Sequence, residues 1–584
     1  MMESGAVGHL AILVALVFNI LAGIAYLAAA RGKSSYEYLG RYSYHIFTGA
    51  VTIGVIYLFY LFFSHDFSMD YVARYSDRAL PFFYLLSAFW GGQEGTYLLW
   101  LFFNALFGYI IIRRGGQYRN YAMAIFALVN MFLLTLLVKL SPFAAAPVVL
   151  ADGLGLNPLL QDPWMVIHPP VIFVGYSMAA VPFAIAMTAL ILNDYSEWIK
   201  RTFPWMVITS LMLAAGNILG GYWAYKTLGW GGFWAWDPVE NSSLIPWFVS
   251  LAVIHGLLVE RRSGALRKTN LLMTAFTFWL VVYGTFLTRS GVLSDFSVHS
   301  FIDLGINNYL VGFLILYFVM TVALFIPRIK SLKSVPLDYN FWGREFILFA
   351  GTMLLFIFSL IVLFWSSLPI LTALVGSDPR AADVSTYNSF ALPLAVIYCL
   401  LLAASPFSKR QPFSLANWTK TALPILSGVA LLGFGLFYIV LDAGFVFGCI
   451  FTAAIGGLLI YFLKPEMFRA LVPGIVAFVV AIIVAWVIGV RDYMYLLYLG
   501  MAALAIVSNL IVVARLASTD WKKMGGQLAH LGFGIMLIGT LGATAYSTNE
   551  KAVLKRGESV ETYGLVLSYQ GMEYDLQYPH NELI

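Results

Sequence analysis

Charged side chains are scarce in this sequence. Of its 584 residues, 11% are Asp, Glu, Lys or Arg and 61% are apolar, whereas soluble domains carry about 25% charged residues. This shortage excludes an ordinary water-soluble fold and indicates that lipid is the main solvent of the chain. The formal net charge of +5 gives no indication of a nucleic-acid partner.

Cysteine is almost absent. Cys399 and Cys449 are the only two, and they lie far apart within separate apolar runs. They form neither a CxxC motif nor a disulfide framework, so the chain brings no redox thiols of its own. No P-loop sequence occurs, which argues against ATP as a source of energy. The first ten residues lack the basic segment of a signal peptide, and we expect the first apolar run to be a retained anchor.

Long apolar runs, in contrast, recur along almost the whole chain. Each is about twenty residues long, enough for a helix to cross a hydrocarbon core about 30 Å thick, and the runs do not alternate in polarity as barrel strands would. We therefore predict an all-α, polytopic transmembrane helical bundle with about sixteen helices. The expected helices cover residues 9–30, 42–63, 94–112, 121–140, 170–192, 204–225, 244–260, 270–288, 309–327, 345–368, 389–405, 422–440, 443–463, 471–490, 493–514 and 526–547.

The distribution of basic residues predicts the orientation of these helices. If the N-terminus lies outside, most of the 34 Lys and Arg residues fall in inner loops, as the positive-inside rule requires. We expect a transmembrane bundle over residues 1–547, with the chemistry in its long outer loops, and an extracytoplasmic tail over residues 548–584. The tail alternates apolar and polar residues, which predicts the start of a small β-rich segment.

Two histidines lie within expected helices. Ionisable groups cost about 3 kcal/mol at the centre of a membrane helix and usually have a partner there. His255 and His530 lie at nearly the same depth, about 7.5 and 10 Å from the inner ends of their helices. A lone histidine would as readily bond a neighbouring carbonyl, but two at matched depth favour axial ligation of a b-type haem iron. No Cys or carboxylate cluster accompanies them, which argues against zinc or di-iron.

A second group of residues is expected at the outer surface. His168 lies in QDPWMVIHPP just before an expected helix, and His299 lies in TRSGVLSDFSVHSF just after another. Between them in sequence, residues 229–247 read GWGGFWAWDPVENSSLIPW and contain Trp230, Trp234 and Trp236. Glycines let a flat ligand approach the backbone, and indole rings offer wide apolar faces. The loop therefore predicts a platform for a porphyrin.

An interfacial aromatic belt is the alternative explanation of these tryptophans. A belt does not require them to stand beside Asp237, Glu240 and Asn241, although Asp237 and Asn241 would also serve as helix caps. On balance the pattern favours the porphyrin platform.

Several motifs together resemble one family. WGGFWAWDPVENSSLIPW is similar to the WWD signature of haem-handling membrane proteins. Four other motifs are similar to the CcmF branch of these proteins: WGGQEGTYLLW, the HPP at His168, GTFLTRSG followed by SVHSF, and QLAHLG around His530. The resemblance spans residues 40–550 and implies a haem lyase of system I cytochrome c maturation, multi-pass in the bacterial inner membrane with its active face periplasmic.

The resemblance also implies roles for individual residues. His168 and His299 match the outer pair that ligates the iron of incoming haem beneath the WWD loop, and His255 and His530 match the inner pair that holds a resident haem b. Arg289 would pair a haem propionate, although the stretch from Arg289 to His299 is slightly longer than the family pattern. The remaining expected site residues come from the loop: Trp230, Trp234, Trp236 and Asp237 as catalytic groups, with Glu240 and Asn241 in cofactor binding.

The implied partners are the haem chaperone CcmE and a CcmH-type subunit that presents apocytochrome c. The CxxCH of the apocytochrome would supply the two thiols that this chain lacks. Membrane quinol is the expected reductant, although no sequence feature indicates it. The family pattern would also continue beyond Ile584 through an outer domain and a final helix.

A haem exporter without lyase chemistry remains the alternative, because an inner and an outer histidine pair also suit two stations on a transport route. A cation antiporter is less compatible with the sequence. It needs charged residues at the membrane midplane, and no Lys, Asp or Glu is centred in an expected helix.

Overall fold

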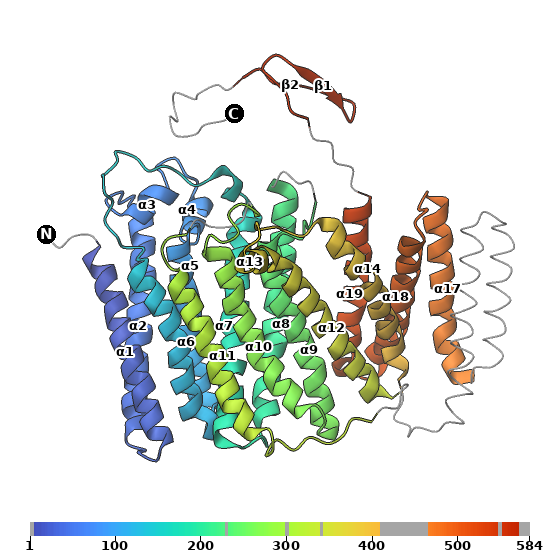
Figure 1. The fold of residues 1–584 in the computed structure, drawn as a ribbon, viewed down its shortest axis with the longest axis horizontal. Helices are drawn as coiled ribbons and strands as arrows, with labels where there is room; N and C mark the ends of the chain where they lie inside the picture. Colours follow the sequence, from blue (N-terminus) through green and yellow to red (C-terminus); the bar gives the residue numbers. More distant parts are fainter. Residues whose placement is uncertain are drawn as a thin grey trace.

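The computed structural model describes residues 5–227, 232–297, 303–338, 343–408, 465–546 and 552–571. Within these residues the chain is mainly helical, and its long helices stand side by side in one bundle (Figure 1). Thirteen of the described helices are long and apolar enough to cross a membrane. The chain is therefore a multi-pass membrane protein, as its composition predicts.

The spanning helices match the expected runs closely. They are α1 (Ala6–Ala30), α2 (Tyr36–Phe63), α5 (Gln93–Arg114), α6 (Arg119–Lys139), α7 (Pro163–Leu192), α8 (Trp198–Thr227), α9 (Pro238–Ser263), α10 (Arg267–Arg289), α11 (Asn307–Phe325), α12 (Arg344–Ser366), α14 (Val384–Ala404), α18 (Tyr493–Thr519) and α19 (Gly525–Ala545). A further apolar helix, α17 (Pro465–Val487), corresponds to the run expected at 471–490. The two remaining expected helices, 422–440 and 443–463, lie outside the described residues.

Two helices that carry candidate residues begin earlier than the sequence predicted. α7 begins at Pro163 and not near residue 170, so the prediction that His168 precedes its helix was wrong. α9 begins at Pro238 and not at residue 244. In both cases an aspartate caps the helix and a proline occupies its first position, a start signal that the apolar pattern does not contain.

Short helices also occur in the connecting segments, where the sequence predicted loops. They are α3 (Asp70–Tyr75), α4 (Phe82–Ala88) and α13 (Leu368–Leu374), with the 3-10 turns η1 (Gly116–Tyr118), η2 (Pro158–Leu160), η3 (Ile326–Arg328), η4 (Ser405–Phe407) and η5 (Trp521–Lys523). Figure 1 shows α3, α4 and α13 at the end of the bundle where α1 begins. This is the end that the orientation argument assigns to the outside.

A hairpin forms in the polar tail, which confirms the expected β-rich segment. β1 (Ser559–Thr562) pairs antiparallel with β2 (Leu565–Ser568), and Thr562 lies opposite Leu565. The two turn residues, Tyr563 and Gly564, both have positive φ angles, 49° and 74°, as in the tight turns that match strand twist. The hairpin lies beyond the same end of the bundle as α3 and α4 (Figure 1).

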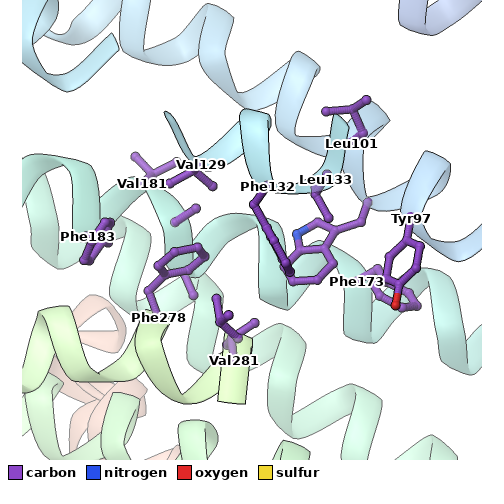
Figure 2. Close-up of a cluster of buried hydrophobic side chains, with 14 of the residues drawn as sticks. Tyr97, Leu101, Val129, Phe132, Leu133, Phe173, Val181, Phe183, Phe278 and Val281 are labelled. Carbon is purple, nitrogen blue, oxygen red and sulfur yellow. The ribbon is translucent and has the colours of Figure 1, made fainter. Parts of the chain in front are cut away.

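Aromatic and branched apolar side chains of α5, α6, α7 and α10 form the middle of a core that also includes side chains of α2 and α9. Figure 2 shows part of it, with side chains of these helices packed between the ribbons. Phe183 of α7 and Phe278 of α10, for example, have ring centres 4.9 Å apart. Because lipid is as apolar as these side chains, such close packing rather than transfer from water holds membrane helices together.

Candidate functional site

The inner histidines lie next to each other. His255 of α9 and His530 of α19 have ring centres 6.1 Å apart and ring planes within 5° of parallel. Nδ1 of His255 lies 2.8 Å from the carbonyl oxygen of Leu251. A carbonyl only accepts, so Nδ1 carries the proton and Nε2 keeps its lone pair. Nδ1 of His530 is buried without a hydrogen-bond partner.

This arrangement is compatible with a metal ion between the two rings. A metal-bound imidazole nitrogen lies about 2 Å from the ion, with the ring centre roughly 1 Å further away, so two such rings are centred about 6 Å apart. The backbone bond to His255 is the kind of outer contact that fixes a ligating histidine's tautomer. Among the described residues, no group of three or more His, Cys, Asp or Glu is placed to hold a metal ion. Two imidazoles alone suit the iron of a haem, whose porphyrin supplies the other ligands.

Aromatic contacts lead from this pair toward the outer loop. Phe533, one turn from His530, has its ring centre 6.4 Å from that of Trp247. Trp247 contacts Phe248 at 5.0 Å, Phe248 contacts Phe358 at 4.7 Å, and Phe358 contacts Trp236 at 6.4 Å. We call these five residues (Phe533, Trp247, Phe248, Phe358 and Trp236) the aromatic path. Through α12 it connects α19 and α9 with residues 232–237, the segment before α9 that carries Trp234 and Trp236, which we call the tryptophan loop.

At the outer loop, Trp236 adopts an unusual backbone conformation. Its φ angle is +56°, in the left-handed region that bulky residues rarely occupy. The indole of Trp234 lies edge-on to it, with ring centres 6.5 Å apart at 86°. The ring nitrogen of Trp234 is buried without a hydrogen-bond partner. Trp230, the third tryptophan expected in the platform, lies outside the described residues.

The polar residues beside the tryptophans organise the start of α9. Asp237 accepts a hydrogen bond from the backbone N–H of Val239 at 2.7 Å, and Glu240 accepts from the backbone N–H groups of Ala235 and Asp237 at 3.0 and 3.3 Å. This is a capping box. Asp237 is therefore the helix cap that its sequence position allowed, whereas the part played by Glu240 in the cap was not predicted. The expected direct roles of both residues toward haem stay predictions.

Asn241 holds the loop rather than capping the helix. Its side-chain N–H groups donate to the carbonyl oxygen of Trp236 at 2.9 Å and to Oγ of Ser366 at 3.0 Å. Both Asn241 and Ser366 are fully buried. The loop is thereby fixed to the outer end of α12.

The outer histidine of α7 is fixed by its neighbour α8. Nδ1 of His168 donates to the carbonyl oxygen of Gly216 at 2.8 Å, so Nε2 carries the lone pair. The ring packs over Gly220, where an added Cβ would lie 2.7 Å from Cε1 of His168. Gly216 and Gly220 are four residues apart, the small-residue spacing that lets membrane helices approach closely. That spacing was the sequence signal for this contact.

An ion pair ties the beginning of α7 to the end of α8. Asp162 caps α7 through the N–H of Trp164 at 2.9 Å, and its Oδ2 lies 2.6 Å from Nζ of Lys226. The ring N–H of Trp223 donates to the carbonyl oxygen of Leu159 at 3.0 Å. These contacts fix the segment from which His168 projects, and the sequence analysis did not identify them.

His299, the other expected outer histidine, lies outside the described residues. The segment leading to it is described as far as Ser297. The hydroxyl of Ser297 donates to Oδ1 of Asp237 at 2.8 Å. The residues just before His299 are thus joined to the tryptophan loop.

Arg289 ends α10 among tyrosines. Tyr71, Tyr75, Tyr97 and Tyr176 are all close enough to interact electrostatically with its guanidinium. Phenol groups and a guanidinium together are hydrogen-bond donors suited to a carboxylate. The assignment of Arg289 to a haem propionate stays a prediction.

Comparisons with known proteins place this geometry in a family context. Residues 90–293 match the family model described as "Cytochrome C assembly protein". The chain is 30% identical over 579 residues to the cytochrome c-type biogenesis protein CcmF of Pseudomonas aeruginosa, covering 97% of this chain and 81% of that protein. It is 30% identical over 510 residues to CcmF of Escherichia coli, covering 86% and 72%.

One solved structure, named "Cytochrome c Heme Lyase CcmF", is similar with a TM-score of 0.67. The similarity covers 98% of this chain and 82% of that one, at 22% sequence identity. It supports the multi-pass helical fold.

Proposed function

Because the chain belongs to the CcmF family of cytochrome c biogenesis proteins, we propose that it is a cytochrome c haem lyase acting within a multi-subunit complex. Haem delivered by a CcmE-type chaperone binds at the outer face, between His168, His299 and the tryptophan loop. A CcmH-type subunit presents apocytochrome c. The CxxCH motif of that substrate supplies both thiols, since this chain contains two cysteines in separate apolar runs.

The inner histidine pair carries the proposal. His255 and His530 have parallel rings 6.1 Å apart, and the aromatic path connects their helices with the tryptophan loop. A resident b haem held by both imidazoles would supply one-electron chemistry. His255 and His530 would hold its iron, with Nε2 of His255 available as a ligand because its Nδ1–H donates to the carbonyl oxygen of Leu251. Membrane quinol is the proposed source of electrons.

The reaction itself demands positioning. In each thioether, the cysteine sulfur bonds to the vinyl carbon next to the porphyrin ring and the thiol hydrogen moves to the terminal carbon, so the step is a redox-neutral addition. His168 and His299 hold the substrate iron, Trp230, Trp234 and Trp236 support the ring face, and Arg289 binds a propionate. Correct orientation of two reacting groups can supply about 7–11 kcal/mol of a barrier.

We place this site on the periplasmic face of a bacterial inner membrane. The support is the distribution of basic residues and the bacterial origin of the relatives. With this orientation, residues 1–547 form the membrane bundle, and the tail 548–584, including the β1–β2 hairpin, is extracytoplasmic.

The proposal can be tested with the purified complex. The protein is loaded with haem by its chaperone, kept reduced and given a peptide that contains CxxCH. Thioether-linked haem, detected as haem that stays on the peptide after denaturation, is the expected product, and Trp236→Ala should form it more slowly.

The haem exporter makes a different prediction in the same preparation. It would move haem across sealed vesicles without the peptide and would leave both vinyl groups unreacted. Transport without any thioether product, with the partner subunits present, would overturn the lyase proposal.

A further inference from the structure

The left-handed backbone conformation of Trp236 is held by contacts from outside the tryptophan loop. A φ of +56° places a bulky residue in a region that L side chains rarely occupy. Conformations of this kind persist only where surrounding contacts hold them, and they gather at functional sites. The contacts that hold Trp236 are therefore candidates for a functional role.

Those contacts come from α14, far along the chain. The ring of Tyr387 stacks on the indole with centres 5.1 Å apart and planes within 5° of parallel. Oδ1 of Asn388, 152 residues after Trp236, accepts the indole N–H at 2.8 Å. Two adjacent residues thus hold the face and the edge of one indole.

A buried set of hydrogen bonds completes the arrangement. Asn241 links the carbonyl oxygen of Trp236 to Oγ of Ser366, and Ser366 lies 3.3 Å from the hydroxyl of Tyr387. The contacts form a closed circuit through Trp236, Asn241, Ser366 and Tyr387. They join the loop to three helices, α9, α12 and α14. Each member restricts the others, so the indole has one defined place.

We propose that Tyr387 and Asn388 are positioning residues of the outer site. They hold Trp236 in its left-handed conformation and so determine the surface that the tryptophan loop offers to haem. Tyr387 covers one face of the indole, and Asn388 fixes its N–H edge. This inference rests on the proposed role of Trp236 in haem binding.

The test compares single substitutions in the complete complex. Tyr387→Ala should raise the concentration of haem-loaded chaperone that gives half-maximal rate by about three- to tenfold, the effect expected for one lost aromatic pair. Asn388→Ala should raise it by about threefold, as for one hydrogen bond. The concentration of CxxCH peptide that gives the half-maximal rate should not change in either variant. Tyr387→Phe keeps the stack and should retain most of the wild-type behaviour.

Phe390→Ala is the matched control. Phe390 lies on α14 three residues beyond Tyr387 and contacts Trp365 of α12 at 6.1 Å, so its loss weakens the same helix pair. It should leave both half-maximal concentrations unchanged. The absorption of the resident haem should persist in all these variants.

A double-mutant cycle distinguishes positioning from general packing, because residues that act through one another are not additive. The effect of Tyr387→Ala should disappear in a Trp236→Ala background. Three results would overturn this inference but not the proposed lyase function. One is a full effect of Tyr387→Ala in the Trp236→Ala background, and another is an equal effect of Phe390→Ala. The third is loss of the resident haem in both Tyr387→Ala and Asn388→Ala. A wild-type rate for Trp236→Ala would instead overturn the role of the loop together with the inference.

Discussion

Gly220 of α8 leaves room for the imidazole of His168, and its replacement by alanine tests whether the position of that ring controls the outer site. The added Cβ would lie 2.7 Å from Cε1 and 2.9 Å from Nδ1 of His168. Non-bonded carbon atoms pack at about 3.5–4.0 Å. The ring must therefore move by roughly 1 Å, or α7 and α8 must separate by a similar distance. Either movement disturbs the 2.8 Å hydrogen bond from His168 to Gly216.

The expected effect follows from the size of this movement. A misplacement of about 1 Å can cost about a hundredfold in rate when geometry controls a reaction. We expect Gly220→Ala to lower the initial rate of thioether formation by roughly 10- to 100-fold. The resident haem should keep its absorption spectrum, because His255 and His530 lie on α9 and α19. The assay combines the CxxCH peptide reaction with a spectrum of the reduced protein.

Gly351→Ala is the control for this substitution. Gly351 lies within the spanning helix α12, and apart from its two neighbours in sequence and the backbone of its own helix turns, no atom lies within 4 Å of a Cβ added there. Its variant should react at the wild-type rate. A wild-type rate for Gly220→Ala as well would refute the argument that the close approach of α8 fixes His168.

Three further predictions concern the two histidine pairs and the loop. His255→Ala or His530→Ala should remove the resident haem, seen as loss of the b-type absorption bands; normal haem content in both variants would contradict the assignment. His168→Ala and His299→Ala should keep that haem but abolish holocytochrome c formation, measured as covalent haem in membranes; wild-type yields in either variant would remove that residue from the site. Asp237→Ala deletes the cap of α9 and should reduce stability by about 1 kcal/mol, measured by thermal unfolding in detergent, and an unchanged unfolding temperature would show that the capping box is dispensable.

The sequence was sufficient to predict the bundle because each apolar run is longer than any alternative element requires. Fourteen of the expected helices have described counterparts, from α1 to α19. The short helices α3, α4 and α13 were missed because six or seven residues carry too little periodicity to be recognised. The starts of α7 and α9 were misplaced because apolarity, and not the capping aspartate, was used to locate them.

The candidate site was also predicted in part from the sequence. The matched depth of His255 and His530 was visible in the sequence, since depth follows from position along a helix. That α9 and α19 face each other was not visible, because helix order in a bundle depends on packing between distant segments. The contact of Tyr387 and Asn388 with Trp236 was unpredictable for the same reason. Periodicity within one segment says nothing about a partner 152 residues away.

The continuous helix α9 bears on the choice between lyase and exporter. It begins at the cap formed by Asp237 beside the tryptophan loop and carries His255 about 27 Å further in, at about 1.5 Å per residue. In that interval Trp247 and Phe248 project from the same helix and form the middle of the aromatic path. A haem moving between the inner and outer pairs along this route would have to displace close-packed rings, which cores resist. An electron needs no such displacement. The packing therefore favours the lyase proposal, in which a resident haem stays at His255 and His530 and passes electrons to the outer site.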